Sequence, residues 1–162
     1  TLVISPPQAG KTTLLRDIAR QLSDKGQRVC IVDERSEIAG CYNGCPQLDV
    51  GLRTDVMDGC PKAEGMLMAL RALSPDVIIT DEIGRAEDAA AIEEALNSGV
   101  RVIASAHGST YEEVAARPNL STLLQRGLFQ RVVILSNRRG PGTIEYIGPV
   151  FRQKGEQHAH HS

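Results

Sequence analysis

The residues near the amino end of the chain have the types and spacing that bind phosphate. Residues 5–12 read SPPQAGKT and match the phosphate-loop pattern G-x-x-x-x-G-K-[ST], except that Ser5 stands where the pattern has glycine. In such loops, backbone N–H groups at a helix start surround the phosphates, the lysine reaches the terminal phosphates, and the hydroxyl joins Mg²⁺. The predicted nucleotide-binding residues are Ser5, Pro6, Pro7, Gln8, Ala9, Gly10, Lys11, Thr12 and Thr13.

A second group of chemically competent residues closes an apolar run, where residues 77–80 are followed by Asp81 and Glu82. A carboxylate at such a strand end often completes a phosphate-loop site, because Mg²⁺ needs an acidic ligand nearby. We expect Thr12 and Asp81 to hold Mg²⁺, with Asp81 acting through water, and Glu82 to be the general base for the attacking water. The alternative is a pair of solvated acids that cap the next helix.

Two further polar segments follow apolar runs. Glu34 and Glu37 come after residues 29–32, and either one could orient the attacking water, so the identity of the base stays open. His107 lies in the run SAHG after residues 100–104, where we expect it to contact the γ-phosphate. The alternatives are an ordinary charged loop and an ordinary loop histidine.

Apolar strands alternate with amphipathic helices along the chain, which indicates an α/β fold with a mainly parallel sheet. The expected strands are residues 1–4, 29–32, 77–80, 100–104 and 132–135, and the expected helices are residues 11–24, 62–73, 86–97, 110–117 and 120–126. The turn at 139–142 predicts a C-terminal hairpin that continues into residues 143–147. The segment 34–58 is expected to be a long functional loop.

Ligands of parallel sheets bind at the carboxyl ends of the strands, where all the polar segments described above fall. The acids must face the phosphate loop across a gap wide enough for Mg²⁺ and the γ-phosphate. Placing the fourth expected strand between the first and third makes this gap. With strands numbered in chain order, we predict a RecA-like P-loop NTPase sheet of order 5-1-4-3-2, followed by the hairpin. No N/T-K-x-D run that reads guanine occurs, so ATP with Mg²⁺ is the expected ligand.

Composition bounds the remaining possibilities. The chain has 162 residues and 41% apolar content, enough for one domain with a real core. A net charge of −2 and 3% aromatic residues give no clear nucleic-acid signal. We expect an ATPase domain at residues 1–148 and a polar, disordered tail at 149–162. Because residue 1 already lies in an expected strand, we also expect that an N-terminal domain is missing from this fragment.

The cysteines leave two alternatives open, a zinc site and a disulfide from Cys60 to Cys41 or Cys45, and a cytosolic setting disfavours the disulfide. Cys41, Cys45 and Cys60 have a spacing that admits a zinc site, but the second close pair typical of such sites is missing. Free thiols are the preferred interpretation.

Three stretches resemble a known family: SPPQAGKTTLLRDIAR at residues 5–20, the long run from Val32 to Arg85, and SAHG at residues 105–108. They are similar to the stage III sporulation protein AA family and, through it, to the type II and type IV secretion ATPases. The resemblance covers the chain from Thr1 to about Gly148. It rests mainly on the long middle run, which is far more specific than a phosphate loop alone.

The resemblance implies a set of roles. Glu34 or Glu37 belongs to an acidic box, Arg53 lies near an arginine box, Glu82 is the conserved acid, and His107 belongs to a histidine box. It also implies a homo-oligomer in the form of a hexameric ring, with sites between subunits. We expect Arg53, in the long loop at the ligand-binding edge, to act as an arginine finger on a neighbouring subunit.

The implied setting is the cytoplasmic face of a membrane on the mother-cell side. The implied partners are membrane-channel proteins of the sporulation complex, and the domain would energise a channel between mother cell and forespore. Other functions compatible with the residues are a nucleic-acid translocase of the RecA-like class, a small-molecule kinase with residues 34–58 as its lid, and a regulatory domain that binds nucleotide without turnover.

Overall fold

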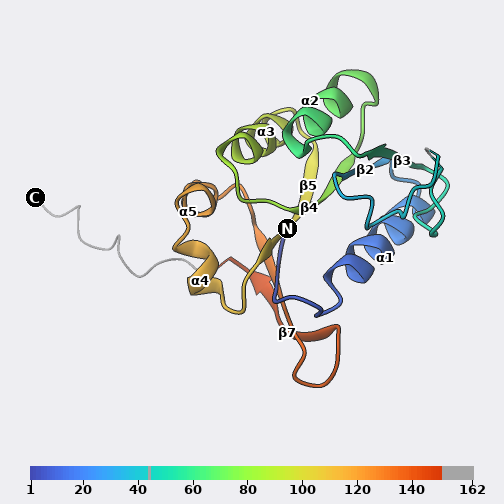
Figure 1. The fold of residues 1–162 in the computed structure, drawn as a ribbon. Coiled ribbons are helices and arrows are strands. Elements are labelled where there is room, and N and C mark those ends of the chain that lie inside the picture. Colours follow the sequence, from blue (N-terminus) through green and yellow to red (C-terminus); the bar gives the residue numbers. More distant parts are fainter. Residues whose placement is uncertain (44, 151–162) are drawn as a thin grey trace, which may run out of the picture.

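The computed structural model describes residues 1–43 and 45–150, which form one seven-stranded sheet flanked by helices on both faces (Figure 1). The strands are β1 (Leu2–Ser5), β2 (Val29–Asp33), β3 (Thr54–Asp58), β4 (Val77–Glu82), β5 (Arg101–His107), β6 (Arg131–Ser136) and β7 (Thr143–Pro149). The helices are α1 (Lys11–Asp24), α2 (Lys62–Ala72), α3 (Ala86–Asn97), α4 (Tyr111–Ala115) and α5 (Pro118–Gln125).

The predicted strand order is confirmed. The sheet runs β3-β2-β4-β5-β1-β6-β7, so the five expected strands stand in the order 5-1-4-3-2. All neighbouring pairs from β3 to β6 are parallel, and β5 separates β1 from β4. The predicted hairpin is also present, because β7 pairs antiparallel with β6 and Ser136 lies opposite Thr143.

One expectation for the segment 34–58 was wrong. Its last five residues are not loop but the edge strand β3, which pairs in parallel with β2 from Val29↔Thr54 to Asp33↔Asp58. The strand carries the polar sequence TDVMD and only partly buries it, so it lacks the apolar run that marks the central strands. Charged side chains on an edge strand also discourage pairing with another sheet.

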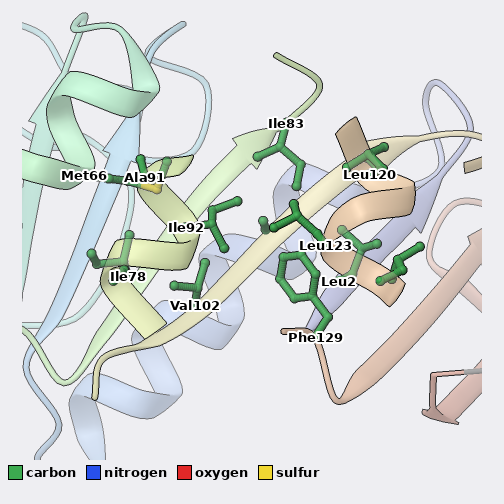
Figure 2. Close-up of a cluster of buried hydrophobic side chains, with 14 of the residues drawn as sticks. Leu2, Met66, Ile78, Ile83, Ala91, Ile92, Val102, Leu120, Leu123 and Phe129 are labelled. Carbon is green, nitrogen blue, oxygen red and sulfur yellow. The ribbon is translucent and has the colours of Figure 1, made fainter. Parts of the chain in front are cut away.

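The two faces of the sheet are covered unequally. Residues that alternate along each strand point to opposite sides, so Leu2 and Ile78 belong to one cluster and Val3 and Ile79 to the other. Figure 2 shows the larger cluster, where side chains of α2, α3 and α5 pack on the sheet and Phe129 lies beside those of α5. The smaller cluster is covered by α1 and by buried residues of the segment after β2, namely Ile38, Ala39 and Val50.

The expected tail at residues 149–162 falls mostly outside the described residues. Strand β7 extends to Pro149, Val150 donates a backbone hydrogen bond to Gln130, and residues 151–162 lie outside the described part of the chain. Within residues 1–43 and 45–150, no helix combines the length and the apolar character needed to cross a membrane.

Candidate nucleotide-binding site

The phosphate loop joins β1 to α1 at the carboxyl edge of the sheet. Ser5 is the last residue of β1, pairs with His107 of β5, and is 1% exposed. Its hydroxyl donates to the carbonyl oxygen of Pro6 at 2.8 Å. Because this residue still has strand conformation, the freedom of a glycine is not required there, which explains how serine fits the pattern.

Gly10, directly before α1, is the position where glycine is required. Its φ is 84°, and a Cβ added to it would lie 2.9 Å from the backbone nitrogen of Gly142. Gln8 also has a positive φ, of 59°. Alternation of left- and right-handed backbone turns successive N–H groups toward one side, and such concave backbones bind anions.

The turn between β6 and β7, residues 137–142, fastens the phosphate loop from outside. The backbone N–H of Gly142 donates to the carbonyl oxygen of Ala9 at 2.7 Å. The Asn137 amide donates from Nδ2 to the carbonyl oxygen of Pro7 at 3.2 Å. We refer to residues 137–142 as the hairpin turn. Sequence reasoning missed this contact, since no local pattern links residues so far apart along the chain.

A cavity of about 340 Å³ opens beside the loop. This volume lies within the range of ~300–1,000 Å³ that is common for small-molecule sites. Its lining combines the loop with two of the residues predicted from other segments, Glu37 and His107. The remaining lining residues are Pro6, Pro7, Gln8, Ala9, Gly10, Lys11 and Thr12. Thr13 is not among them.

Glu37 is placed by a neighbouring acid that the sequence interpretation did not single out. Asp33 is fully buried, and its carboxylate accepts backbone N–H groups from Glu37 at 3.0 Å, Ile38 at 3.2 Å and Ala39 at 2.9 Å. On the other side, Arg16 of α1 donates from Nε to the carbonyl oxygen of Ile38 at 2.6 Å. The start of the segment after β2 is therefore fixed to both the sheet and α1.

Asp81 and Glu82 lie at the end of β4, where the pairing with β5 is irregular. Ile79 pairs with Ile103 but Glu82 pairs with Ser105, so β4 has one extra residue there. Such bulges re-aim side chains and are common beside functional sites. Asp81 is 7% exposed, whereas Glu82 is exposed and makes no hydrogen bond or ion pair with the described residues.

Two buried polar atoms near the end of β4, one of them on the adjacent strand β5, lack hydrogen-bond partners. Among the described residues, Asp81 Oδ1 and Ser105 Oγ are buried side-chain atoms without a hydrogen bond. Burial raises the pKa of Asp81, while Lys62 acts in the opposite direction. Unsatisfied buried groups are rare in native proteins and often await a ligand, ion or water. A cation next to Asp81 would favour the ionised carboxylate.

Glu34 lies apart from the residues that line the cavity and is paired with Lys62, the first residue of α2. The Lys62 ammonium donates to Glu34 Oε2 and lies 3.6 Å from Asp81 Oδ1. The hydrogen bond from Lys62 lowers the pKa of Glu34. The sequence shows that Lys62 is a cation, but nothing near it in the sequence indicates that it pairs with Glu34 and Asp81.

Arg53 is not at the ligand-binding edge, so the expected placement was wrong. Its backbone N–H donates to Ser23 Oγ at 2.8 Å near the end of α1, and its carbonyl oxygen accepts from the N–H of Val29 at the start of β2. The segment after β2 crosses to the opposite edge of the sheet before β3 begins, and Arg53 immediately precedes that strand. A role on a neighbouring subunit stays a prediction.

The residues fit Mg²⁺ and a triphosphate. The concave phosphate loop, with Lys11 and Thr12, lines the cavity. Near the end of β4, two places from β1 in the sheet, Asp81 has a buried oxygen without a hydrogen bond from the described residues. The described residues contain no group of three or more His, Cys, Asp or Glu side chains placed to hold a metal, which includes Cys41, Cys45 and Cys60. Phosphate oxygens and water would therefore have to supply most ligands of Mg²⁺.

The strand order, the phosphate loop between β1 and α1, and the acidic end of β4 define a P-loop NTPase fold of the RecA-like class. The Legionella pneumophila ATPase DotB shares it with a TM-score of 0.61 and 23% identity, over 82% of this chain and 39% of that chain. The VirB11 ATPase of the Brucella suis type IV secretion system shares it with a TM-score of 0.65 and 19% identity, over 91% and 47%. At these identities the likeness shows the fold alone.

Within that class, the family model described as sporulation stage III, protein AA matches residues 1–157, and the chain belongs to this family. Stage III sporulation protein AA of Bacillus subtilis (strain 168) is 54% identical over 153 residues, which cover 91% of this chain and 50% of that protein. Protein SEEDLING PLASTID DEVELOPMENT 1 of Arabidopsis thaliana is 38% identical over 126 residues, 76% and 18%. The chain thus spans half the length of the Bacillus relative and less than a fifth of the Arabidopsis relative. The family resemblance predicted from the sequence is confirmed.

Proposed function

We propose that this domain binds Mg-ATP in the cavity beside the phosphate loop and hydrolyses it. One observation carries the proposal. Asp81, with a buried oxygen that accepts no hydrogen bond from the described residues, lies at the carboxyl end of β4, which β5 separates from the strand before the phosphate loop. That separation leaves room for Mg²⁺ and the γ-phosphate between a binding loop and an acid.

Lys11 would contact the β- and γ-phosphates, and Thr12 would offer its hydroxyl to Mg²⁺. Bound Mg²⁺ would supply positive charge that offsets the negative charge developing on the phosphate during hydrolysis. Asp81 would hold the waters around the ion. His107, at the end of β5 and in the lining of the cavity, would contact the γ-phosphate.

Glu82 is the better candidate for the general base. It is exposed at the end of β4 and makes no hydrogen bond or ion pair with the described residues, so its carboxylate is available to accept a proton. Glu34 is bonded to Lys62, which lowers its pKa and makes it a weaker base. Glu37, which lines the cavity, remains a candidate for orienting the attacking water.

Relatives of the same fold support this assignment by analogy. The VirB11 structure contains sulphate, and the pilus retraction motor PilT was solved with bound ADP at a TM-score of 0.57 and 18% identity to this chain. Sulphate has the shape of phosphate. These facts concern those proteins, and by analogy they favour a nucleotide as the ligand here.

The direct test is a phosphate-release assay with ATP and Mg²⁺ and no acceptor molecule. Hydrolysis under these conditions supports the proposal, and the Lys11→Ala variant is the control for contaminating activity. Turnover that appears only when an acceptor is added would favour a small-molecule kinase. Tight, salt-sensitive DNA binding with DNA-stimulated turnover would favour a translocase.

We further propose that the active form is a homo-oligomeric ring, with a hexamer as the expected size, in which Arg53 completes a neighbour's site. This proposal predicts a rate that rises with protein concentration, because the complete site forms only on assembly. Size measurement with and without ATP tests the assembly.

Mixing Arg53→Ala and Glu82→Gln subunits tests directly whether Arg53 acts as an arginine finger on a neighbouring subunit. Some mixed sites would have an intact Glu82 and an intact neighbouring Arg53, so activity should partly return. A rate independent of concentration, with no recovery on mixing, would show that one chain holds the whole site. Arg28→Ala subunits, altered at the same edge of the sheet, are the matched control.

In the whole protein, we propose that this motor works on the cytoplasmic face of a membrane and drives a channel between mother cell and forespore. The proposal rests on the family to which the chain belongs. Fractionation of sporulating cells that carry the full-length protein tests it. We expect the protein to sediment with membranes and to lose that association when the channel proteins are deleted.

A further inference from the structure

Lys62 occupies a place between two acids on the hydrolytic side of the site. Its ammonium donates to Glu34 Oε2 and lies 3.6 Å from Asp81 Oδ1. The lysine side chain is 12% exposed and that of Asp81 is 10% exposed. The three residues come from the start of α2, the segment after β2 and the end of β4.

The start of a helix is an unfavourable place for a cation. The helix dipole places positive partial charge at the amino end, so acidic residues are the ones favoured in the first turn. Helices α3 and α4 follow this preference with two acids each in the first turn, whereas α2 has one acid there, Glu64, and begins with Lys62. The stability of α2 therefore does not account for a lysine at this position, and the two carboxylates do.

The contact with Asp81 differs from the contact with Glu34. Glu34 accepts a hydrogen bond, whereas Asp81 Oδ1 has no hydrogen-bond partner among the described residues and meets Lys62 only at ion-pair distance. An ion pair without a hydrogen bond is the weaker of the two contacts. A second cation that approaches Asp81 would thus displace Lys62 from Asp81 but not from Glu34.

We propose that Lys62 is a positioning residue that balances the charge of Asp81 in the nucleotide-free site and yields this carboxylate to Mg²⁺ when Mg-nucleotide enters. After the exchange Lys62 stays bonded to Glu34 alone. The inference rests on the proposed function, because it requires Mg-nucleotide to bind beside Asp81.

The exchange links occupancy of the site to α2. Lys62 is the first residue of that helix, and Met66 and Ala69 of α2 pack in the same cluster as Ala91 and Ile92 of α3. A change in the contacts of Lys62 therefore acts on the helical layer that covers this face of the sheet. The reciprocity of linked equilibria requires that Lys62 oppose Mg²⁺ as much as Mg²⁺ opposes the Lys62–Asp81 contact.

The test compares nucleotide affinity with and without metal. The dissociation constant of a fluorescent ADP analogue is measured in excess Mg²⁺ and in EDTA. The constant in EDTA divided by the constant in Mg²⁺ reports how strongly the protein–nucleotide complex favours Mg²⁺. In Lys62→Met, which removes the competing charge, the ratio should rise by about fivefold or more. Lys62→Arg keeps the charge and should retain the parent ratio.

A second variant, Glu34→Gln, is expected to change the ratio in the opposite direction. In Glu34→Gln, Lys62 loses its stronger partner and remains with Asp81, so the ratio should fall below that of the parent chain. A ratio that is unchanged or lower in Lys62→Met overturns the inference, since Lys62 would then orient Asp81 rather than compete for it. If the parent chain binds no nucleotide in either buffer, the proposed function fails, and this inference fails with it. Equal ratios among variants that do bind nucleotide overturn the inference alone.

Discussion

The two sides of the candidate site are held together by different kinds of contact. On the phosphate-loop side, backbone carbonyl groups of Pro7 and Ala9 accept hydrogen bonds from the hairpin turn. On the acidic side, charged groups hold one another: Lys62 joins Glu34 to Asp81, and one oxygen of Asp81 remains without a hydrogen bond.

In the proposed function, the phosphate-loop side serves nucleotide binding and the acidic side serves hydrolysis. Backbone contacts fix the phosphate loop before any ligand arrives, so the binding side is preorganised. If the proposed exchange holds, the acidic side depends on which cation is present and reaches its working arrangement only with Mg-nucleotide. Substitutions on the two sides should therefore fail in different ways.

The largest effect is expected from Glu82→Gln on the acidic side. Loss of a general base typically costs ~10²–10⁴-fold in rate, so ATP hydrolysis should fall by about that factor while nucleotide affinity stays within about threefold of the parent. Phosphate release and fluorescent-nucleotide binding measure the two quantities. Glu87→Gln, at an exposed site in the first turn of α3, is the control. Unchanged hydrolysis would move the base to Glu34 or Glu37.

On the phosphate-loop side, Lys11→Ala should weaken binding itself. A hydrogen bond to a charged group contributes about 1.5–3 kcal/mol, which corresponds to a loss of about 10- to 100-fold in nucleotide affinity. Calorimetric titration with ADP and Mg²⁺ measures the change. The unfolding temperature of the ligand-free chain should not change, because Lys11 makes no ion pair with the described residues. Lys25→Ala, exposed beyond α1, should bind as the parent does.

Asp33→Asn tests how the acidic side is built. The carboxylate accepts three backbone N–H groups, and an amide has one acceptor oxygen, so at least one buried donor loses its partner. The free energy of unfolding should fall by about 1–3 kcal/mol. Urea denaturation measures this free energy, and Asp24→Asn, at an exposed position at the end of α1, is the control. Stability equal to that of the parent would mean that these three bonds do not hold the segment after β2.

The smallest effect is expected from Asn137→Ala in the hairpin turn. One exposed hydrogen bond to the phosphate loop is lost, at about 0.5–1.5 kcal/mol of unfolding free energy. The bond from Gly142 to Ala9 remains, so ADP affinity should change little. A large loss of affinity with no loss of stability would show that the turn acts on nucleotide directly, and would remove the contrast between the two sides.

Much of the fold followed from local patterns. The strand-loop-helix at residues 2–24 and the acids at 81 and 82 are marked by apolar runs, by glycine and by helical spacing. The order of the strands followed from a chemical requirement, because a magnesium site needs a gap between the loop and the acid. Strand β3 escaped prediction because an edge strand buries little and its sequence, TDVMD, has only two apolar residues.

What the sequence could not reveal are contacts between segments far apart along the chain. Nothing near Lys62 indicates that it meets Glu34 and Asp81, and nothing near Asp33 indicates that its carboxylate organises the next six residues. Arg53 was misplaced for a similar reason. The segment after β2 was treated as lying at one edge, whereas its backbone crosses to the other before β3 begins.

The contact between the hairpin turn and the phosphate loop also bears on how the chain folds. Asn137 and Pro7 are 130 positions apart, so the phosphate loop is fastened by a segment that leaves the ribosome well after the loop itself. Contacts of such long range form late, because the intervening chain must be ordered first. The phosphate loop would then take its final shape only after β6 and β7 have paired. Nucleotide would stabilise the finished domain and not the intermediates that precede it.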